Sequence, residues 1–154
     1  MITNRLIAQL QDDEGFRKMP YFCTAGALTI GYGYNLDENE LAISAGQVKL
    51  FKQNGISQKT AVNLLIDVLI KREKTLQNRL PWLSKLSPAR RDVFMNMAYQ
   101  LGERGFFNFN RTLAAAQRGD YAACADYMLQ SRWALQTPNR AKRLAKQMKT
   151  GEYA

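Results

Sequence analysis

The feature that most constrains the fold of this chain is a change in its hydrophobic pattern near residue 34. Over residues 21–34, short apolar pieces are broken at Gly26, Gly31 and Gly33, a pattern typical of a small hairpin or meander. Beyond that stretch, apolar residues recur at helical spacing almost to the end of the chain. The sequence therefore predicts an α+β fold that is mainly helical, with one small β-hairpin lobe near the N-terminus.

The hairpin follows a helix that is predicted from residue 2 to about residue 11, with Leu10 on its apolar face. Three acids crowd together at its end, at residues 12–14, before Gly15. Acids there are unfavourable, each by a few tenths of a kcal/mol, because the carbonyl end of a helix carries partial negative charge. Two interpretations stay open, a solvated acidic turn closed by Gly15 or a functional acid, Glu14, that faces the hairpin.

A long helix is predicted over residues 57–80, with Ser57 as its N-cap and Pro81 as its stop. We expect one domain over residues 1–154. Its parts are a β-lobe at about 15–56, the linking helix at about 57–80, and a helical lobe at about 81–154 that includes the N-terminal helix at 2–13. Further helices are predicted at about 40–52, after Ser87-Pro88, at 111–118, at 121–130 and from Pro138.

Three side chains around the hairpin are spaced in a way that suits the cleavage of a glycosidic bond. Glu14 stands at the helix end, and Cys23 and Thr29 stand on successive pieces of the hairpin, so all three can face one groove. This reaction needs a carboxylic acid to protonate the leaving oxygen and a second group on the opposite face of the sugar, which activates water or attacks the anomeric carbon. Glu14 fits the first role.

The order of these residues, with Thr29 inside a Thr-Ile-Gly-x-Gly motif, resembles the T-even phage lysozyme family of endolysins, glycoside hydrolase family 24. Residues 89–97, 100–103 and 131–143 are similar to that family in the same order, and the last of these runs is the most specific. The resemblance covers nearly the whole chain. It implies a two-lobed lysozyme-like fold and a muramidase that hydrolyses the β-1,4 bond between N-acetylmuramic acid and N-acetylglucosamine in bacterial peptidoglycan, for phage-induced host lysis.

The resemblance also implies roles for individual residues. Glu14 is then the general acid, Thr29 helps to hold the attacking water, and Arg140 and Asn96 surround the catalytic glutamate. Arg140 can instead be a solvated cation on the surface of a basic C-terminal helix. The residues that the resemblance places along the saccharide groove are Gly33, Tyr34, Leu36, Tyr99, Gln100, Thr112 and Arg132.

Several aromatic residues allow two interpretations. Tyr34 and Tyr99 can stack on sugar faces, or can lie at the protein boundary with their hydroxyls in water. Phe106, Phe107 and Phe109 can be exposed stacking groups, but three neighbouring phenylalanines more often pack in a core.

Cys23 occupies the position where an aspartate is commonest in the family. An unperturbed thiol has a pKa of about 8.5, so only a small fraction is thiolate at neutral pH unless neighbouring cations lower the pKa. Cys23 is therefore either a base, a nucleophile for a retaining route, or simply a half-buried hydrophobe in a strand. Cys124 lies in a helix-period stretch and is expected in a core or an interface, and we do not expect it to form a disulfide with Cys23.

The 22 basic and 13 acidic side chains give a formal charge of +9, which favours polyanions. No nucleic-acid motif is recognisable, so nucleic acid is not the expected partner, and an anionic bacterial envelope would attract the same charge. The alternative is a basic, non-catalytic module that binds glycan or nucleic acid. A transglycosylase that uses one acid and no water is disfavoured, because Cys23 and Thr29 would be superfluous.

The sequence has no histidine and no spacing of cysteines that is typical of a metal site, so neither a metal nor another cofactor is expected.

The sequence has no apolar run of the roughly 20 residues needed to span a bilayer, and its N-terminus does not resemble an export signal. We therefore expect no membrane insertion. A monomer made in the host cytoplasm would need a separate membrane pore protein to reach the cell wall or periplasm.

Overall fold

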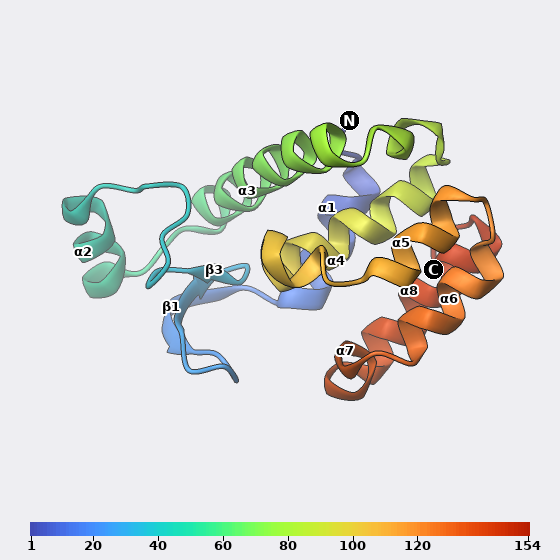
Figure 1. The fold of residues 1–154 in the computed structure, drawn as a ribbon. Coiled ribbons are helices and arrows are strands. Elements are labelled where there is room, and N and C mark those ends of the chain that lie inside the picture. Colours follow the sequence, from blue (N-terminus) through green and yellow to red (C-terminus); the bar gives the residue numbers. More distant parts are fainter. The chain divides into compact units, whose positions relative to one another are not determined.

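The computed structural model describes residues 1–154. It contains two compact units, Met1–Lys71 and Arg72–Ala154, and the boundary between them falls within the long helix α3 (Gln58–Arg79). Most of the chain is helical, and the strands form one small sheet (Figure 1). This confirms the predicted α+β, mainly helical fold.

Helix α1 (Asn4–Glu14) begins the first unit. The backbone N–H of Leu6 donates to the N-cap hydroxyl of Thr3 at 3.0 Å. The helix continues three residues beyond its predicted end, because Gly15, with φ of 68°, is the first residue to leave the helical conformation. The small electrostatic cost of the acids does not stop the helix earlier.

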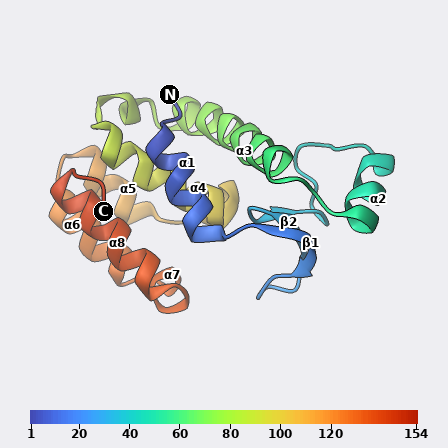
Figure 2. The same ribbon diagram turned by 180° about the vertical axis from the view of Figure 1, so that it is seen from behind.

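The sheet contains β1 (Arg17–Phe22), β2 (Leu28–Gly31) and β3 (Tyr34–Asn35), antiparallel and in that order, as the predicted hairpin or meander requires. Thr29 on β2 pairs with Tyr21 on one side and with Asn35 on the other. In both views of the ribbon the sheet lies between α1 and α2 (Figures 1 and 2).

Helix α2 (Ala45–Asn54) starts five residues later than predicted, with Ser44 as its N-cap. The prediction of helix from residue 40 was wrong because Asn39 organises a loop there. Its side-chain amide donates to the carbonyl of Ile43 at 2.7 Å, and its side-chain oxygen accepts from the backbone N–H of Ile43 at 3.1 Å. Such local side-chain bonds compete with helix formation. Helix α3 begins after Ser57, as predicted.

The second unit is a helical assembly. Helix α6 packs against α5 and α8, and α8 also contacts α4 and α7. Its core includes the fully buried Phe94, Met97, Met128 and Leu144. The short α7 and the 3-10 helix were not predicted, because five residues are too few to show a period. The elements are the 3-10 helix Pro81–Lys85, α4 (Pro88–Phe106), α5 (Asn110–Gln117), α6 (Tyr121–Leu129), α7 (Arg132–Gln136) and α8 (Pro138–Thr150).

Helix α4 is kinked at Gly102, where φ is 73° and ψ is 168°. Near this kink, the carbonyl of Ala98 accepts a hydrogen bond from Nε of the buried Arg72 at 3.0 Å. Glu103, just after the kink, lies 3.7 Å from Arg72 and accepts from the hydroxyl of Thr75 at 2.9 Å. These contacts join Arg72 and Thr75 of α3 to α4 on both sides of the kink.

Both cysteines are free thiols. Cys124 is fully buried in the second unit, which confirms its predicted core position. Burial, reinforced by the charge of Asp120, raises the pKa of Cys124 to about 12.

None of the helices has the length and apolar character that crossing a membrane requires.

Candidate active site

Glu14 is the last residue of α1, and its carboxyl packs against the turn between β2 and β3. A Cβ atom built on Gly33 would lie 2.9 Å from Oε2 of Glu14 and 3.2 Å from its Cδ. Gly33 also has a φ of 76°, which favours glycine. The close approach that glycine permits here is therefore to the predicted catalytic acid itself.

Tyr32, which was not selected from the sequence, holds this arrangement together. Its hydroxyl accepts from Nε2 of Gln11 on α1 at 3.3 Å and from Nε2 of Gln58 on α3 at 2.9 Å. Its ring lies 5.5 Å from that of Phe16 and is almost completely buried. Tyr32 thus ties the end of α1 and the start of α3 to the turn that faces Glu14.

Thr29 and Cys23 come together at the other end of the β1–β2 hairpin. Thr29 is buried, and its hydroxyl donates to the carbonyl of Ala27 at 2.9 Å. A hydrogen bond from the backbone of Ala27 is the main cause that lowers the pKa of Cys23, helped by the backbone of Ala25 and the hydroxyl of Thr29, while partial burial acts in the opposite direction. Backbone dipoles and a hydroxyl, not cations, therefore favour the thiolate.

Tyr21 lies within electrostatic reach of both Glu14 and Cys23. Burial raises its pKa most, and the negative charges of Glu14 and Cys23 raise it further, against the opposing effect of Arg17. The guanidinium of Arg17 lies 4.4 Å from the centre of the Tyr21 ring. Because Tyr21 also pairs with Thr29 in the sheet, the three residues predicted to be catalytic occupy one region of the first unit. Sequence reasoning did not select Tyr21.

We expect Gly33→Ala to lower the rate of peptidoglycan hydrolysis about 10- to 100-fold, because the new methyl group would displace the Glu14 carboxyl and small misplacements of a catalytic group are costly. The matched control is Gly119→Ala. Gly119 has a similar φ of 79°, but an added Cβ there meets no atom within 4 Å. The initial rate of wall clearing is measured for both variants. A Gly33→Ala protein as fast as Gly119→Ala would contradict the proposed importance of this contact.

The second unit brings Asn96 and Arg140 together, as the resemblance implied. Asn96 is fully buried on α4, and its side-chain oxygen accepts from Nε of Arg140 at 3.0 Å and from Nη2 at 2.8 Å. Arg140 stands in the first turn of α8 and is half-buried, so it is not a fully solvated cation. The prediction that the two residues surround Glu14 stays a prediction.

Tyr34 and Leu36, both predicted to bind substrate, are buried in the first unit. The hydroxyl of Tyr34 donates to Oδ1 of Asn39 at 2.7 Å and accepts from the backbone N–H of Leu41 at 3.1 Å. Burial raises the pKa of Tyr34. Leu36 contributes to a separate hollow of about 460 Å³. The binding roles of both residues stay predictions.

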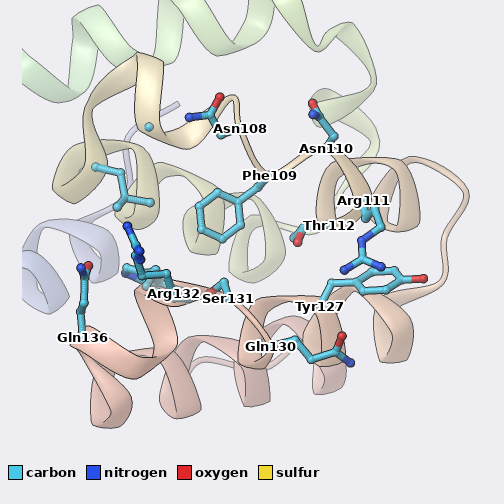
Figure 3. Close-up of a pocket in the computed structure, with 13 residues that line it drawn as sticks. Asn108, Phe109, Asn110, Arg111, Thr112, Tyr127, Gln130, Ser131, Arg132 and Gln136 are labelled. Carbon is cyan, nitrogen blue, oxygen red and sulfur yellow. The ribbon is translucent and has the colours of Figure 1, made fainter.

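Thr112 and Arg132, also predicted to bind substrate, meet in a pocket of about 530 Å³ in the second unit (Figure 3). Gln100 does not line this pocket, but it accepts a hydrogen bond at 2.7 Å from Nε1 of Trp133, which does. Tyr99 is buried and does not line it. The lining residues are Leu101, Gly105, Asn108, Phe109, Asn110, Arg111, Thr112, Tyr127, Gln130, Ser131, Arg132, Trp133 and Gln136.

The phenylalanines divide between the two interpretations. Phe106 is fully buried and makes edge-to-face contacts with Phe94 and Phe107, as expected for packing. Phe109 instead lines the pocket, edge-to-face with Trp133 at a distance of 6.1 Å between the ring centres.

The chain has no group of three or more histidine, cysteine or acidic side chains that could hold a metal ion.

The chain was compared with known proteins. Residues 11–149 match the family described as phage lysozyme. Two relatives from Dictyostelium discoideum are named probable T4-type lysozymes 1 and 2. The first is 26% identical, over 92% of this chain and 92% of the relative, and the second is 27% identical, over 97% and 96%. The pre-baseplate central spike protein Gp5 of Enterobacteria phage T4 is 29% identical over 92% of this chain but only 27% of its own length. The chain therefore belongs to the phage lysozyme family, the T4-type glycoside hydrolases of family 24, a membership that implies a peptidoglycan muramidase.

Proposed function

We propose that this protein hydrolyses the bond between N-acetylmuramic acid and N-acetylglucosamine with Glu14 as the acid, Thr29 as the residue that holds water, and Cys23 as the base or nucleophile. The observation that carries this assignment is the packing of the Glu14 carboxyl against Gly33, in the same unit as the Cys23–Thr29 pair. Tyr21 lies within electrostatic reach of both Glu14 and Cys23, because the charges of both residues raise its pKa.

The acid step follows from the position of Glu14. In its protonated form, the carboxyl gives its proton to the glycosidic oxygen as the bond to the anomeric carbon breaks, so the leaving sugar departs as a neutral alcohol. The carboxylate that remains is negative, and the glycine backbone of the turn leaves room for it. Gly33 is thus proposed to shape the acid's position, in addition to any contact with the glycan.

The second step needs a group on the other face of the sugar. The Thr29 hydroxyl has one proton, which it can donate either to the carbonyl of Ala27 at 2.9 Å or to Cys23, and in both arrangements a lone pair of its oxygen can accept a hydrogen from water. The Cys23 thiolate can take a proton from that water and give an inverted product. It can instead attack the anomeric carbon and form a thioglycosyl intermediate, which water then hydrolyses with retention.

The two rival functions fit less well. Membership of a glycoside hydrolase family disfavours a basic, non-catalytic module. A transglycosylase would leave the Cys23–Thr29 pair without a role. The formal charge of +9 supports attraction to an anionic envelope, with a strength that salt reduces.

We further propose that the biological role is phage-induced lysis, with synthesis in the host cytoplasm and access to the wall through a separate membrane pore. Expression in bacterial cytoplasm tests this. Cells should stay intact until a pore-forming protein is co-expressed and should then lyse, whereas cells with Glu14→Gln should stay intact in both cases. Lysis without a pore, or intact cells with a pore although the purified protein clears walls, would contradict the proposed role.

A further inference from the structure

The turn between β2 and β3 is in close contact with two helices. It contains Tyr32 between two glycines, Gly31 at the end of β2 and Gly33. On one side, a Cβ atom built on Gly33 would lie 2.9 Å from Oε2 of Glu14 on α1. On the other side, a Cβ atom built on Gly31 would lie 3.1 Å from the Cβ of Ala61 on α3. Both distances are shorter than an ordinary van der Waals contact, so neither side has room for an added methyl group.

Tyr32 makes hydrogen bonds to the same two helices. Its hydroxyl accepts from Nε2 of Gln58, the first residue of α3, at 2.9 Å, and from Nε2 of Gln11 on α1 at 3.3 Å. Only 4% of Tyr32 is exposed, so its side chain is not open to a substrate. Contacts with the start of α3 and with α1 therefore meet at one buried side chain, next to the glycine that faces Glu14.

The segment of the chain that carries Glu14 contacts Tyr32 on both sides of the acid. Gln11, three residues before Glu14, donates to the Tyr32 hydroxyl. Phe16, two residues after Glu14, has its ring centre 5.5 Å from that of Tyr32. The backbone N–H of Gly15 donates to the carbonyl of Gln11 at 3.0 Å, which closes the helix between these two contacts. The place of the Glu14 carboxyl therefore depends on the place of Tyr32.

We propose that Tyr32 is a positioning residue for the general acid, and that its hydrogen bond with Gln58 couples the start of α3 to the Glu14 carboxyl. This inference rests on the proposed function, because it concerns Glu14 as the acid. Helix α3 continues from the first unit into the second, so a shift of this helix would reach the acid through Gln58 and the turn. A misplacement of about 1 Å can lower the rate of catalysis about 100-fold.

The first test is Tyr32→Phe, which keeps the ring and removes the hydroxyl. The control, Tyr153→Phe, removes a hydroxyl that donates to Oδ2 of the fully buried Asp92 at 2.6 Å in the second unit. For each variant, kcat and KM are measured on soluble, uncrosslinked peptidoglycan, and stability is measured by urea unfolding. We expect kcat of Tyr32→Phe to fall about tenfold with KM changed by less than about twofold, because the acid acts in the bond-breaking step. Tyr153→Phe should keep kcat and KM within about twofold of the wild type, although both variants should unfold at lower urea concentrations.

The coupling to α3 is tested with Gln58→Ala and with a double variant that combines Tyr32→Phe and Gln58→Ala. Gln58→Ala should lower kcat about three- to tenfold. The control Gln77→Ala, which removes an exposed carboxamide elsewhere on α3, should leave kcat unchanged. The double variant should be no slower than Tyr32→Phe, because both single changes remove the same hydrogen bond. Losses in kcat that multiply in the double variant would overturn the coupling.

Glu14→Gln, measured on the same substrate, separates this inference from the proposed function. An inactive Glu14→Gln beside a Tyr32→Phe with the kcat of Tyr153→Phe would overturn the inference alone. A Tyr32→Phe whose loss lies in KM and not in kcat would do the same. A wild type that cleaves no peptidoglycan, or a Glu14→Gln as active as the wild type, would overturn the proposed function and this inference with it.

Discussion

Glu14→Gln is expected to lower the rate of peptidoglycan hydrolysis by about 10²- to 10⁴-fold, the usual contribution of a general acid. Glutamine has nearly the same shape as glutamate, so it can occupy the space beside Gly33 without disturbing the turn. Its amide does not have an acidic proton to give to the glycosidic oxygen. The measurement is the initial rate at which a suspension of purified peptidoglycan loses turbidity.

The matched control is Asp12→Asn, which removes a carboxylate from the same end of α1. Asp12 is exposed, two residues before Glu14. This variant should clear the wall within about twofold of the wild-type rate, because exposed substitutions change little. If Glu14→Gln clears the wall as fast as Asp12→Asn, Glu14 is not the acid and the site lies elsewhere.

Cys23→Ala should produce the second large effect, a loss of about 10²-fold or more, because it removes the base or nucleophile. Cys23→Asp restores the residue that is commonest in the family and should retain most of the activity. The two variants are compared on the same wall preparation. Full activity of Cys23→Ala would show that Cys23 is only a packed strand residue.

The pH dependence identifies the active form of Cys23. Hydrogen bonds from the backbone of Ala27 and Ala25 and from Thr29 lower the pKa of Cys23. If the thiolate is the active form, activity falls as the pH drops through this pKa, at a pH below the ordinary thiol value of about 8.5. An aspartate stays ionised to about pH 4, so Cys23→Asp should keep its activity to lower pH. If the activity of the wild type and of Cys23→Asp falls over the same acidic pH range, Cys23 does not act as a thiolate base or nucleophile.

Alkylation provides a check that does not depend on a variant. At neutral pH, iodoacetamide should modify Cys23 and inactivate the enzyme. Cys124 should stay unmodified, because it is fully buried and burial raises its pKa to about 12. Peptide mass spectrometry locates the label. A protein labelled only at Cys23 that keeps full activity would exclude a chemical role for this thiol.

The sequence predicts those parts of the fold that local signals determine. Ser57 and Ser87 cap α3 and α4 as predicted, since a hydroxyl before an apolar helical repeat is a local signal. The start of α2 was wrong because the Asn39 side chain organises a loop that no apolar period shows. The kink at Gly102 was also not predicted, because a single glycine inside an apolar helical repeat does not determine whether the helix bends there.

The candidate site divides in the same way. Glu14, Cys23 and Thr29 were selected from their spacing and from the resemblance, and their roles remain to be tested. Tyr21 and Tyr32 were missed because their importance comes from contacts with α1, α3 and the neighbouring strand. The lowering of the pKa of Cys23 arises largely from hydrogen bonds of backbone groups, which the identity of side chains does not reveal.

The most direct test of the central claim is mass spectrometry of the soluble fragments that the wild-type protein releases from purified peptidoglycan. Hydrolysis with Glu14 as the acid predicts fragments that end in reducing N-acetylmuramic acid, with one water added for each bond broken, and no such fragments from Glu14→Gln. Fragments that end in anhydro sugars, fragments that end in reducing N-acetylglucosamine, or the same products from Glu14→Gln would contradict the account.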